Sequence, residues 1–229
     1  MRRTSLLMIG VVLLAVARGS ADESSWTAPP SNAQLQRDPT LIPKSKGFLF
    51  VPALSVPLGN EPSYFVYLDG ERIASAPTGR GVLLNPGTYD VLIGSGAISQ
   101  LIRKTVPIVE GQTTMLKPDW AALVIDVIDA TRTSVNETYE ILETDGEPYG
   151  VGYGIEEERG ERVRTWLLRP GVYHVVRVGE SVTTIRKFSV QLTPGTLTQR
   201  NLVVDTGPGT TGDFIGFYPR PVLQTSRAE

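Results

Sequence analysis

The stretch LLNPGTYDVLIGSG, residues 83–96, returns in outline as LLRPGVYHVVRVG at residues 167–179. In both places two leucines, one further residue, Pro-Gly, one further residue and a tyrosine lead into an apolar run, and the two occurrences lie 84 positions apart. Internal similarity at a long spacing is the signature of a repeated structural unit. The sequence therefore predicts two copies of one small fold.

Other landmarks recur in the same order. Gly111 returns 84 positions later, whereas two further motifs return 76 positions later, Asn60-Glu61 as Asn136-Glu137 and Asp69-Gly70-Glu71 as Asp145-Gly146-Glu147. The change of offset from 76 to 84 indicates eight additional residues in the second copy, which we place in an inserted loop or hairpin at residues 149–165. Repeat 1 is expected over residues 47–118 and repeat 2 over residues 119–205.

Short runs rich in β-branched and aromatic residues indicate the fold class. The runs YFVYL, YDVLI, YEILE and YHVVRV are bounded by Asp-Gly, Pro-Gly or Glu-Gly pairs, which is typical of short strands joined by tight turns. No window carries a long apolar stripe of helical period. We therefore predict an all-β chain of two tandem antiparallel β-sandwich repeats, immunoglobulin-like or prealbumin-like, behind a signal peptide.

The Pro-Gly pair is interpreted as a tight turn between two strands. Proline fixes φ at the first corner, and glycine accepts the positive φ that a type II turn needs at the second. Because side chains alternate along a strand, one set of residues is expected in the core and the other outside. The expected core residues are Tyr89, Val91, Ile93, Tyr173 and Val175, and the expected outward residues are Asp90 and His174.

The segments outside the repeats are read from composition. Residues 1–21 combine an Arg-Arg pair, an apolar run and small residues, which predicts a secretory signal peptide cleaved after Ala17 or Ala21, with a retained membrane anchor as the alternative. Residues 22–46 are proline-rich and polar and are expected to form an extended tether. Residues 206–229 are expected to form a C-terminal tail.

Charge and cysteine content restrict the cellular compartments and the classes of partner that are expected for the chain. The chain has 22 basic and 24 acidic residues, and residues 1–21 hold three arginines and no acid, so the exported chain would carry a net charge of about −5. Such a surface does not attract nucleic acid. The chain contains no cysteine, which excludes disulfides and thiolate metal sites. We expect a bacterial protein of the periplasm or associated with the outer membrane, with no membrane span in the mature chain.

At the segments YLDGERIA…VLLNPGTYDVLIG and ETDGEPYG…WLLRPGVYHVVRVG, the chain resembles the PEGA-type and carboxypeptidase-regulatory-like families of small β-sandwiches. The letters PEGA themselves are absent, and SAPTG or GVGYG stands near their place. The resemblance rests on turn chemistry and bears on fold more than on function. It implies a non-enzymatic accessory module of an envelope protein.

Candidate catalytic and metal-binding residues are few. His174 is the only histidine, and its place on a strand favours a surface role. YGVGYG at residues 149–154 lacks the following helix and the lysine of a phosphate-binding loop. Glu156-Glu157-Glu158 lacks the alternating ligands of a calcium loop. We predict no enzyme activity, no cofactor and no metal, a small hydrolase being the weakest alternative.

The insertion concentrates residue types that dominate binding interfaces. Loops on a rigid sandwich tend to carry recognition. The candidate binding residues are Tyr149, Tyr153, Arg159, Arg162, Arg164 and Trp166, although Trp166 could equally belong to the core. The function predicted is a spacer or docking module for an envelope partner, such as an outer-membrane barrel or a transport component. The alternative is a carbohydrate-binding module for peptidoglycan or an exported glycan.

Overall fold

The computed structural model describes residues 27–56, 60–154, 165–183, 186–209 and 212–220. Apart from the short helix α1 (Ser31–Gln36) and one 3₁₀ turn, η1 (Ile98–Gln100), the regular structure of these residues is β-strand. No helix among them is both long and apolar enough to cross a bilayer. The predicted signal peptide lies outside the described residues.

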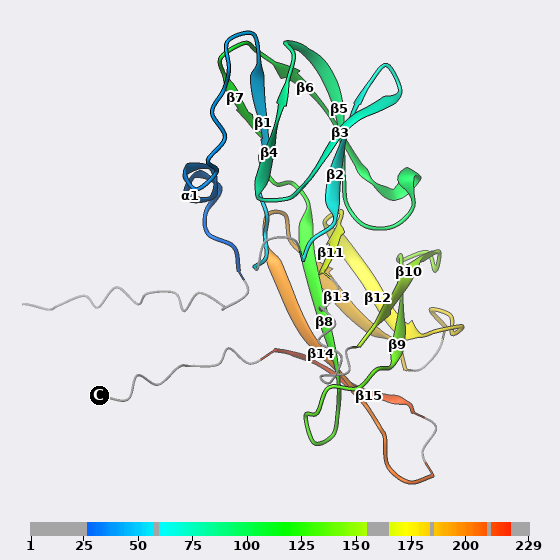
Figure 1. Ribbon diagram of the computed structural model, residues 1–229. Helices are drawn as coiled ribbons and strands as arrows, with labels where there is room; N and C mark the ends of the chain where they lie inside the picture. The colour runs from blue at the N-terminus through cyan, green and yellow to red at the C-terminus, as the bar shows by residue number, and fades with distance from the viewer. Residues whose placement is uncertain (1–26, 57–59, 155–164, 184–185, 210–211, 221–229) are drawn as a thin grey trace, which may run out of the picture.

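Two β units follow one another along the chain (Figure 1). Among the described residues, the first has seven strands: β1 (Gly47–Val51), β2 (Ser63–Leu68), β3 (Glu71–Pro77), β4 (Arg80–Leu84), β5 (Gly87–Ile93), β6 (Ile102–Ile108) and β7 (Thr113–Met115). The described part of the second has eight: β8 (Ala121–Asp129), β9 (Thr138–Leu142), β10 (Pro148–Tyr153), β11 (Thr165–Leu168), β12 (Gly171–Arg177), β13 (Phe188–Leu192), β14 (Leu197–Val204) and β15 (Phe214–Pro219).

The two units have the same strand order. The sheets of the first unit are β4-β1-β7 and β3-β2-β5-β6, and those of the second are β11-β8-β14-β15 and β10-β9-β12-β13. Adding seven to each strand number of the first unit gives the second, except that β15 extends one sheet. The predicted fold class is therefore confirmed, with one refinement: β1 pairs in parallel with β7, as β8 does with β14, so one sheet of each unit is mixed.

The Leu-Leu-x-Pro-Gly-x-Tyr motif forms the corner between the two sheets of each unit. Strands β4 and β5 on either side of it belong to different sheets, so the predicted tight turn joins two sheets and does not close a hairpin. Gly87 and Gly171 have φ of 158° and 154°, not the value near 80° of a type II turn. The hydroxyl of Tyr89 donates to the carbonyl of Asn85 at 2.9 Å, and Tyr173 makes the same bond to Arg169 at 3.1 Å. Each tyrosine thus ties its strand back to the corner, as in immunoglobulin-type sandwiches.

The core positions predicted from strand alternation are confirmed. The five expected residues are at most 6% exposed, and Asp90 and His174 lie on the opposite strand faces. Each unit has its own cluster of buried apolar side chains between its sheets. The first cluster also takes in three residues from the second unit, Trp120, Ala122 and Leu167. The two cores therefore meet at the junction between the units.

Ser95 links the two units through hydrogen bonds. Its N–H donates to the carbonyl of Leu167 at 2.9 Å, and its Oγ accepts from the Leu167 N–H at 3.0 Å. Its carbonyl accepts from the Tyr149 hydroxyl at 2.9 Å, and Arg169 donates to the carbonyl of Leu101 at 3.1 Å. Ser95 is 5% exposed, so these polar groups have little access to water and depend on one another.

A second hydrogen bond recurs in both units. It joins the glycine turn before β7 or β14 to the residue just before β1 or β8. Gly111 and Gly195 both have φ of 69°, a left-handed conformation that favours glycine. The N–H of Gly111 donates to the carbonyl of Lys46, just before β1, and that of Gly195 donates to the carbonyl of Trp120, just before β8. The landmark pair at an offset of 84 is thus a true structural equivalence.

The Asn-Glu match at an offset of 76 is not a structural equivalence. Val66 lies opposite Val91 in the first unit, and Ile141 lies opposite Val175 in the second. Because Val91 and Val175 are 84 positions apart, β2 and β9 correspond at an offset of 75. Accordingly Glu61 is buried, whereas Glu137 is exposed.

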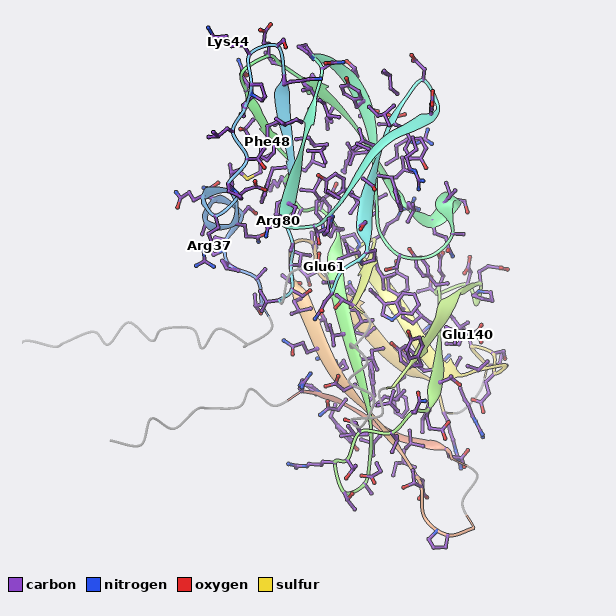
Figure 2. The ribbon with its side chains drawn as sticks, viewed as in Figure 1. Arg37, Lys44, Phe48, Glu61, Arg80 and Glu140 are labelled. Atoms are coloured by element: carbon purple, nitrogen blue, oxygen red, sulfur yellow. The ribbon has the colours of Figure 1, made fainter. Side chains whose placement is uncertain are left out.

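Buried Glu61 organises the end of the first unit that lies toward the second (Figure 2). Its Oε1 accepts from the N–H groups of Leu54 and Ser55 at 2.7 and 2.6 Å and from Ser55 Oγ at 2.9 Å. Its Oε2 accepts from Thr78 Oγ1 at 2.7 Å. Burial raises the pKa of the Glu61 carboxyl, and these hydrogen bonds offset part of that rise. The carboxyl thus joins the chain after β1 to the β3–β4 turn.

The expected extended tether is wrong for its described part, because residues 27–46 pack on the first unit. Helix α1 carries Gln34, which is 5% exposed. The Gln34 amide donates to the carbonyls of Pro29 and Ala53 and accepts from the Ala53 N–H. Asp38 accepts from the N–H of Gly81 on β4. These side-chain hydrogen bonds and a backbone bond from Ala28 to Leu54, rather than an apolar pattern, connect the segment to the first unit. Residues 22–26 lie outside the described residues.

Two other predicted boundaries also change. Residues 149–153, placed in the insertion, belong to strand β10 (Pro148–Tyr153), which corresponds to β3. The extra length therefore falls after Tyr153, and its residues 155–164 lie outside the described residues. The predicted tail contains β15, which pairs antiparallel with β14. The second unit therefore extends beyond residue 205.

Candidate functional site

The structure separates the predicted binding residues. Tyr149 and Trp166 are 6% and 0% exposed and stack edge to face in the core of the second unit, with ring centroids 6.4 Å apart. The Trp166 indole donates to the Tyr139 hydroxyl at 2.9 Å. Both are therefore core residues and not surface binding residues. Tyr153 is 42% exposed on β10 and remains a candidate, and Arg159, Arg162 and Arg164 lie outside the described residues.

A different surface carries a groove. It lies on the outer face of strands β8, β14 and β15 and has a volume of about 630 Å³. Its polar lining residues are Asp126, Asp129, Arg132, Ser134, Asn201, Tyr218 and Arg220. Figure 1 shows these three strands in the second unit, with β14 alongside β8. The volume is within the range of about 300–1,000 Å³ that small-molecule sites occupy.

Tyr218 provides an exposed aromatic surface in the groove. It is 58% exposed and faces outward opposite Asn201. Gly216, two residues earlier on the same face, leaves room for the ring, because a Cβ atom there would come within 2.2 Å of Tyr218 Cε2. The tyrosine ring therefore lies along the strand over a glycine backbone instead of standing out into solvent.

Asp126 and Arg220 form an ion pair in the groove. Their side chains are 14% and 28% exposed, so the pair is largely shielded from water. Burial raises the pKa of the Asp126 carboxyl, and the neighbouring Arg220 guanidinium offsets part of the rise. The backbone N–H of Arg220 also donates to the carbonyl of Gln199 at 3.3 Å. The pair is thus held on the sheet surface by backbone pairing.

A tight turn after β8 forms one rim. Asp129 Oδ1 accepts from the N–H groups of Thr131 and Thr133 at 2.8 and 2.9 Å and from Thr131 Oγ1 at 2.7 Å. The Thr131 hydroxyl and these N–H groups lower the pKa of the Asp129 carboxyl. Arg132 sits at the tip with a φ of 69°. The rim is therefore ordered by its own hydrogen bonds.

His174 lies elsewhere, on the sheet β10-β9-β12-β13. Its Nδ1 is 2.8 Å from Ser189 Oγ, and desolvation together with Lys187 lowers its pKa. Within the described part of the chain, no three histidine or acidic side chains come together in a group that could hold a metal ion.

Sequence reasoning missed the groove because three of its lining residues, Tyr218, Pro219 and Arg220, lie in the predicted tail. A β-bulge at Ile215 shifts the pairing, so Phe214 lies opposite Val204 and Phe217 opposite Leu202. Both phenylalanines then face the core although they are three positions apart. Strict alternation, the usual strand signal, is therefore broken at this point.

Comparison with known proteins yields distant structural likenesses. No family model matches the chain, and no curated protein matches it. The TIE protein of Bacillus anthracis superposes with a TM-score of 0.29 at 16% identity, over 70% of this chain and 34% of that one. BcpA, the major pilin subunit of Bacillus cereus, gives 0.31 at 11% identity, over 66% and 58%. A candidate cell adhesion protein of Bacteroides ovatus gives 0.34 at 10% identity, over 80% and 99%.

The chain thus spans 34% and 58% of the lengths of the two Bacillus proteins. Likenesses of this strength carry no argument about activity or partners, which have to come from the chain itself.

Proposed function

We propose that the chain is an exported, non-enzymatic accessory protein that acts as a spacer or docking module for a protein of the bacterial envelope. The observation that carries the proposal is the junction between the two units. Leu167 and Trp120 enter the core cluster of the first unit, and Ser95 hydrogen-bonds to Leu167 through both its backbone and its side chain. A linker without such contacts would leave tandem domains free to move.

The fold has the features of a rigid spacer. Two units of one strand order follow each other, and polar as well as apolar contacts cross the junction. An ion pair between Lys104 and Asp119 adds to these contacts beside the joint. A spacer holds its ends at a fixed separation, and a docking module presents its binding surface in a fixed direction. A buried junction serves either role.

The docking surface is proposed on the second unit around Tyr153. Its exposed ring on β10 immediately precedes the segment that carries Arg159, Arg162 and Arg164. Tyrosine and arginine contribute more binding energy at interfaces than most other residues. The same segment also carries four acids, Glu156, Glu157, Glu158 and Glu161, so it offers a partner charges of both signs and no net positive charge.

Affinity capture from an envelope extract tests this function. The full chain is used as bait beside the variant Arg159→Glu/Arg162→Glu/Arg164→Glu. A matched control reverses three exposed cations elsewhere, Lys44→Glu/Arg72→Glu/Lys117→Glu. We expect one envelope protein to be captured by the wild type and by the control, and to be lost with the first variant. Equal capture by both variants, or no envelope protein above background, would contradict the proposal.

A further inference from the structure

We propose that the groove on the outer face of β8, β14 and β15 binds a neutral saccharide, with one sugar ring packed on Tyr218 and its hydroxyl groups bonded to Asp126, Asn201 and Arg220. This site is on a different sheet from Tyr153 and does not rest on the proposed docking function. It also differs from the glycan site that the aromatic residues of the insertion suggested, since Tyr149 and Trp166 are buried.

The aromatic surface is the first argument. A pyranose has an apolar C–H face and a rim of hydroxyls, so it suits a flat ring with polar groups beside it. Tyr218 offers such a ring, 58% exposed and lying over Gly216. The face of a tyrosine ring carries the negative part of its quadrupole, which attracts the weakly positive C–H groups of a sugar.

The polar groups are the second argument. The Asp126 carboxylate accepts hydrogen bonds, the Arg220 guanidinium donates them, and the Asn201 amide does both. A sugar hydroxyl is both donor and acceptor and can therefore bond to each of them. Asp126 and Arg220 are already paired on the sheet surface, so little side-chain freedom is lost when a ligand binds.

The charge balance of the lining selects a neutral ligand. The charged lining residues are two acids, Asp126 and Asp129, and two cations, Arg132 and Arg220. Opposite charges in equal number leave the lining with no net charge, so it has no overall preference for an anion or a cation. Asp129 Oδ1 is moreover already occupied by three hydrogen bonds within its turn. A nucleotide, a phosphorylated ligand or an acidic sugar would meet no surplus of positive charge.

Calorimetric titration of the full chain with short saccharides tests the site. The neutral probes are tetrasaccharides of N-acetylglucosamine, of β-1,4-linked glucose, of α-1,4-linked glucose and of mannose, and the anionic probe is a galacturonic acid tetramer. We expect at least one neutral probe to bind and the anionic probe to bind more weakly. Tyr218→Ala should reduce the affinity by about tenfold or more, which corresponds to about 1.4 kcal/mol.

Three further variants separate binding from folding. Tyr218→Phe keeps the ring and should bind within about threefold of the wild type, about 0.65 kcal/mol. Gly216→Ala keeps Tyr218 but displaces its ring, so it should weaken binding while the melting curve stays cooperative. Tyr153→Ala removes another exposed tyrosine and should leave the affinity unchanged.

Three outcomes would overturn the proposal: no neutral probe binds, the anionic probe binds best, or Tyr218→Ala and Tyr153→Ala bind alike. Capture of a protein partner that requires Tyr218, without saccharide binding, would also contradict it. Loss of saccharide binding in Tyr218→Ala while envelope capture persists would support a separate site and leave the docking function standing.

Discussion

At the scale of single residues, the repeated tyrosine explains why the Leu-Leu-x-Pro-Gly-x-Tyr motif occurs twice. Tyr89 and Tyr173 fill the two cores with their rings, and each returns a hydrogen bond to the carbonyl four residues earlier. Pro-Gly alone would allow either a hairpin or a corner between sheets, since both need the same local chemistry. Sequence alternation predicted the burial of the tyrosine correctly, but the corner depends on which sheet each strand joins. That choice is a long-range property that no local motif specifies.

Removing the tyrosine hydroxyls tests these corners. Tyr89→Phe and Tyr173→Phe should each lower the free energy of unfolding by about 1 kcal/mol, because each leaves a backbone carbonyl without its partner while the ring still fills the core. The measurement is urea denaturation followed by tryptophan fluorescence. Tyr153→Phe, an exposed tyrosine, serves as the control and should change stability by less than about 0.5 kcal/mol. Losses no larger than the control's would mean that the hydroxyls do not support the corners.

At the scale of elements, strands with regularly alternating apolar residues were predictable from the sequence. Elements that depend on a β-bulge or on side-chain hydrogen bonds were not. Strand β5 is predictable from its sequence because Tyr89, Val91 and Ile93 occupy alternate positions and are all buried, although Leu92 between the last two is buried as well. Strand β15 does not, because the bulge at Ile215 breaks its period. Helix α1 has only six residues and is held by the amide of Gln34, so no apolar stripe marks it. The candidate groove follows from β15 and was missed for the same reason.

The loop at Ser95 is the element on which the junction depends. Ser95→Ala removes the acceptor of the Leu167 N–H and leaves that buried donor unpaired, so it should lower the free energy of unfolding by about 1–3 kcal/mol. Ser75→Ala, an exposed serine on β3, is the matched control and should lie within about 0.5 kcal/mol of the wild type. Both are measured by urea denaturation. A Ser95→Ala variant as stable as Ser75→Ala would show that the junction does not need this hydrogen bond.

At the scale of the whole molecule, the repeat was visible in the sequence, but the packed junction between the two repeats was not. The recurring landmarks predicted two similar units, yet nothing in them indicated that Leu167 of the second motif would pack into the first unit. Its counterpart Leu83 is 37% exposed and belongs to neither core cluster. Two equal motifs thus acquire different surroundings from their order in the chain. The junction that results is the basis of the proposed spacer or docking role.

The distance between the two units in solution tests that junction most directly. The chain has no cysteine, so a pair of spin labels can be placed at Thr88→Cys on β5 and Thr138→Cys on β9, both exposed, without removing a native thiol. A second pair within the first unit, at Glu71→Cys and Thr88→Cys, gives the width of the distance distribution that the motion of the labels alone produces. A rigid junction predicts one narrow distance distribution between the units, as narrow as that of the second pair and centred on the separation in the structure. A broad distribution, or one with several maxima, would contradict it.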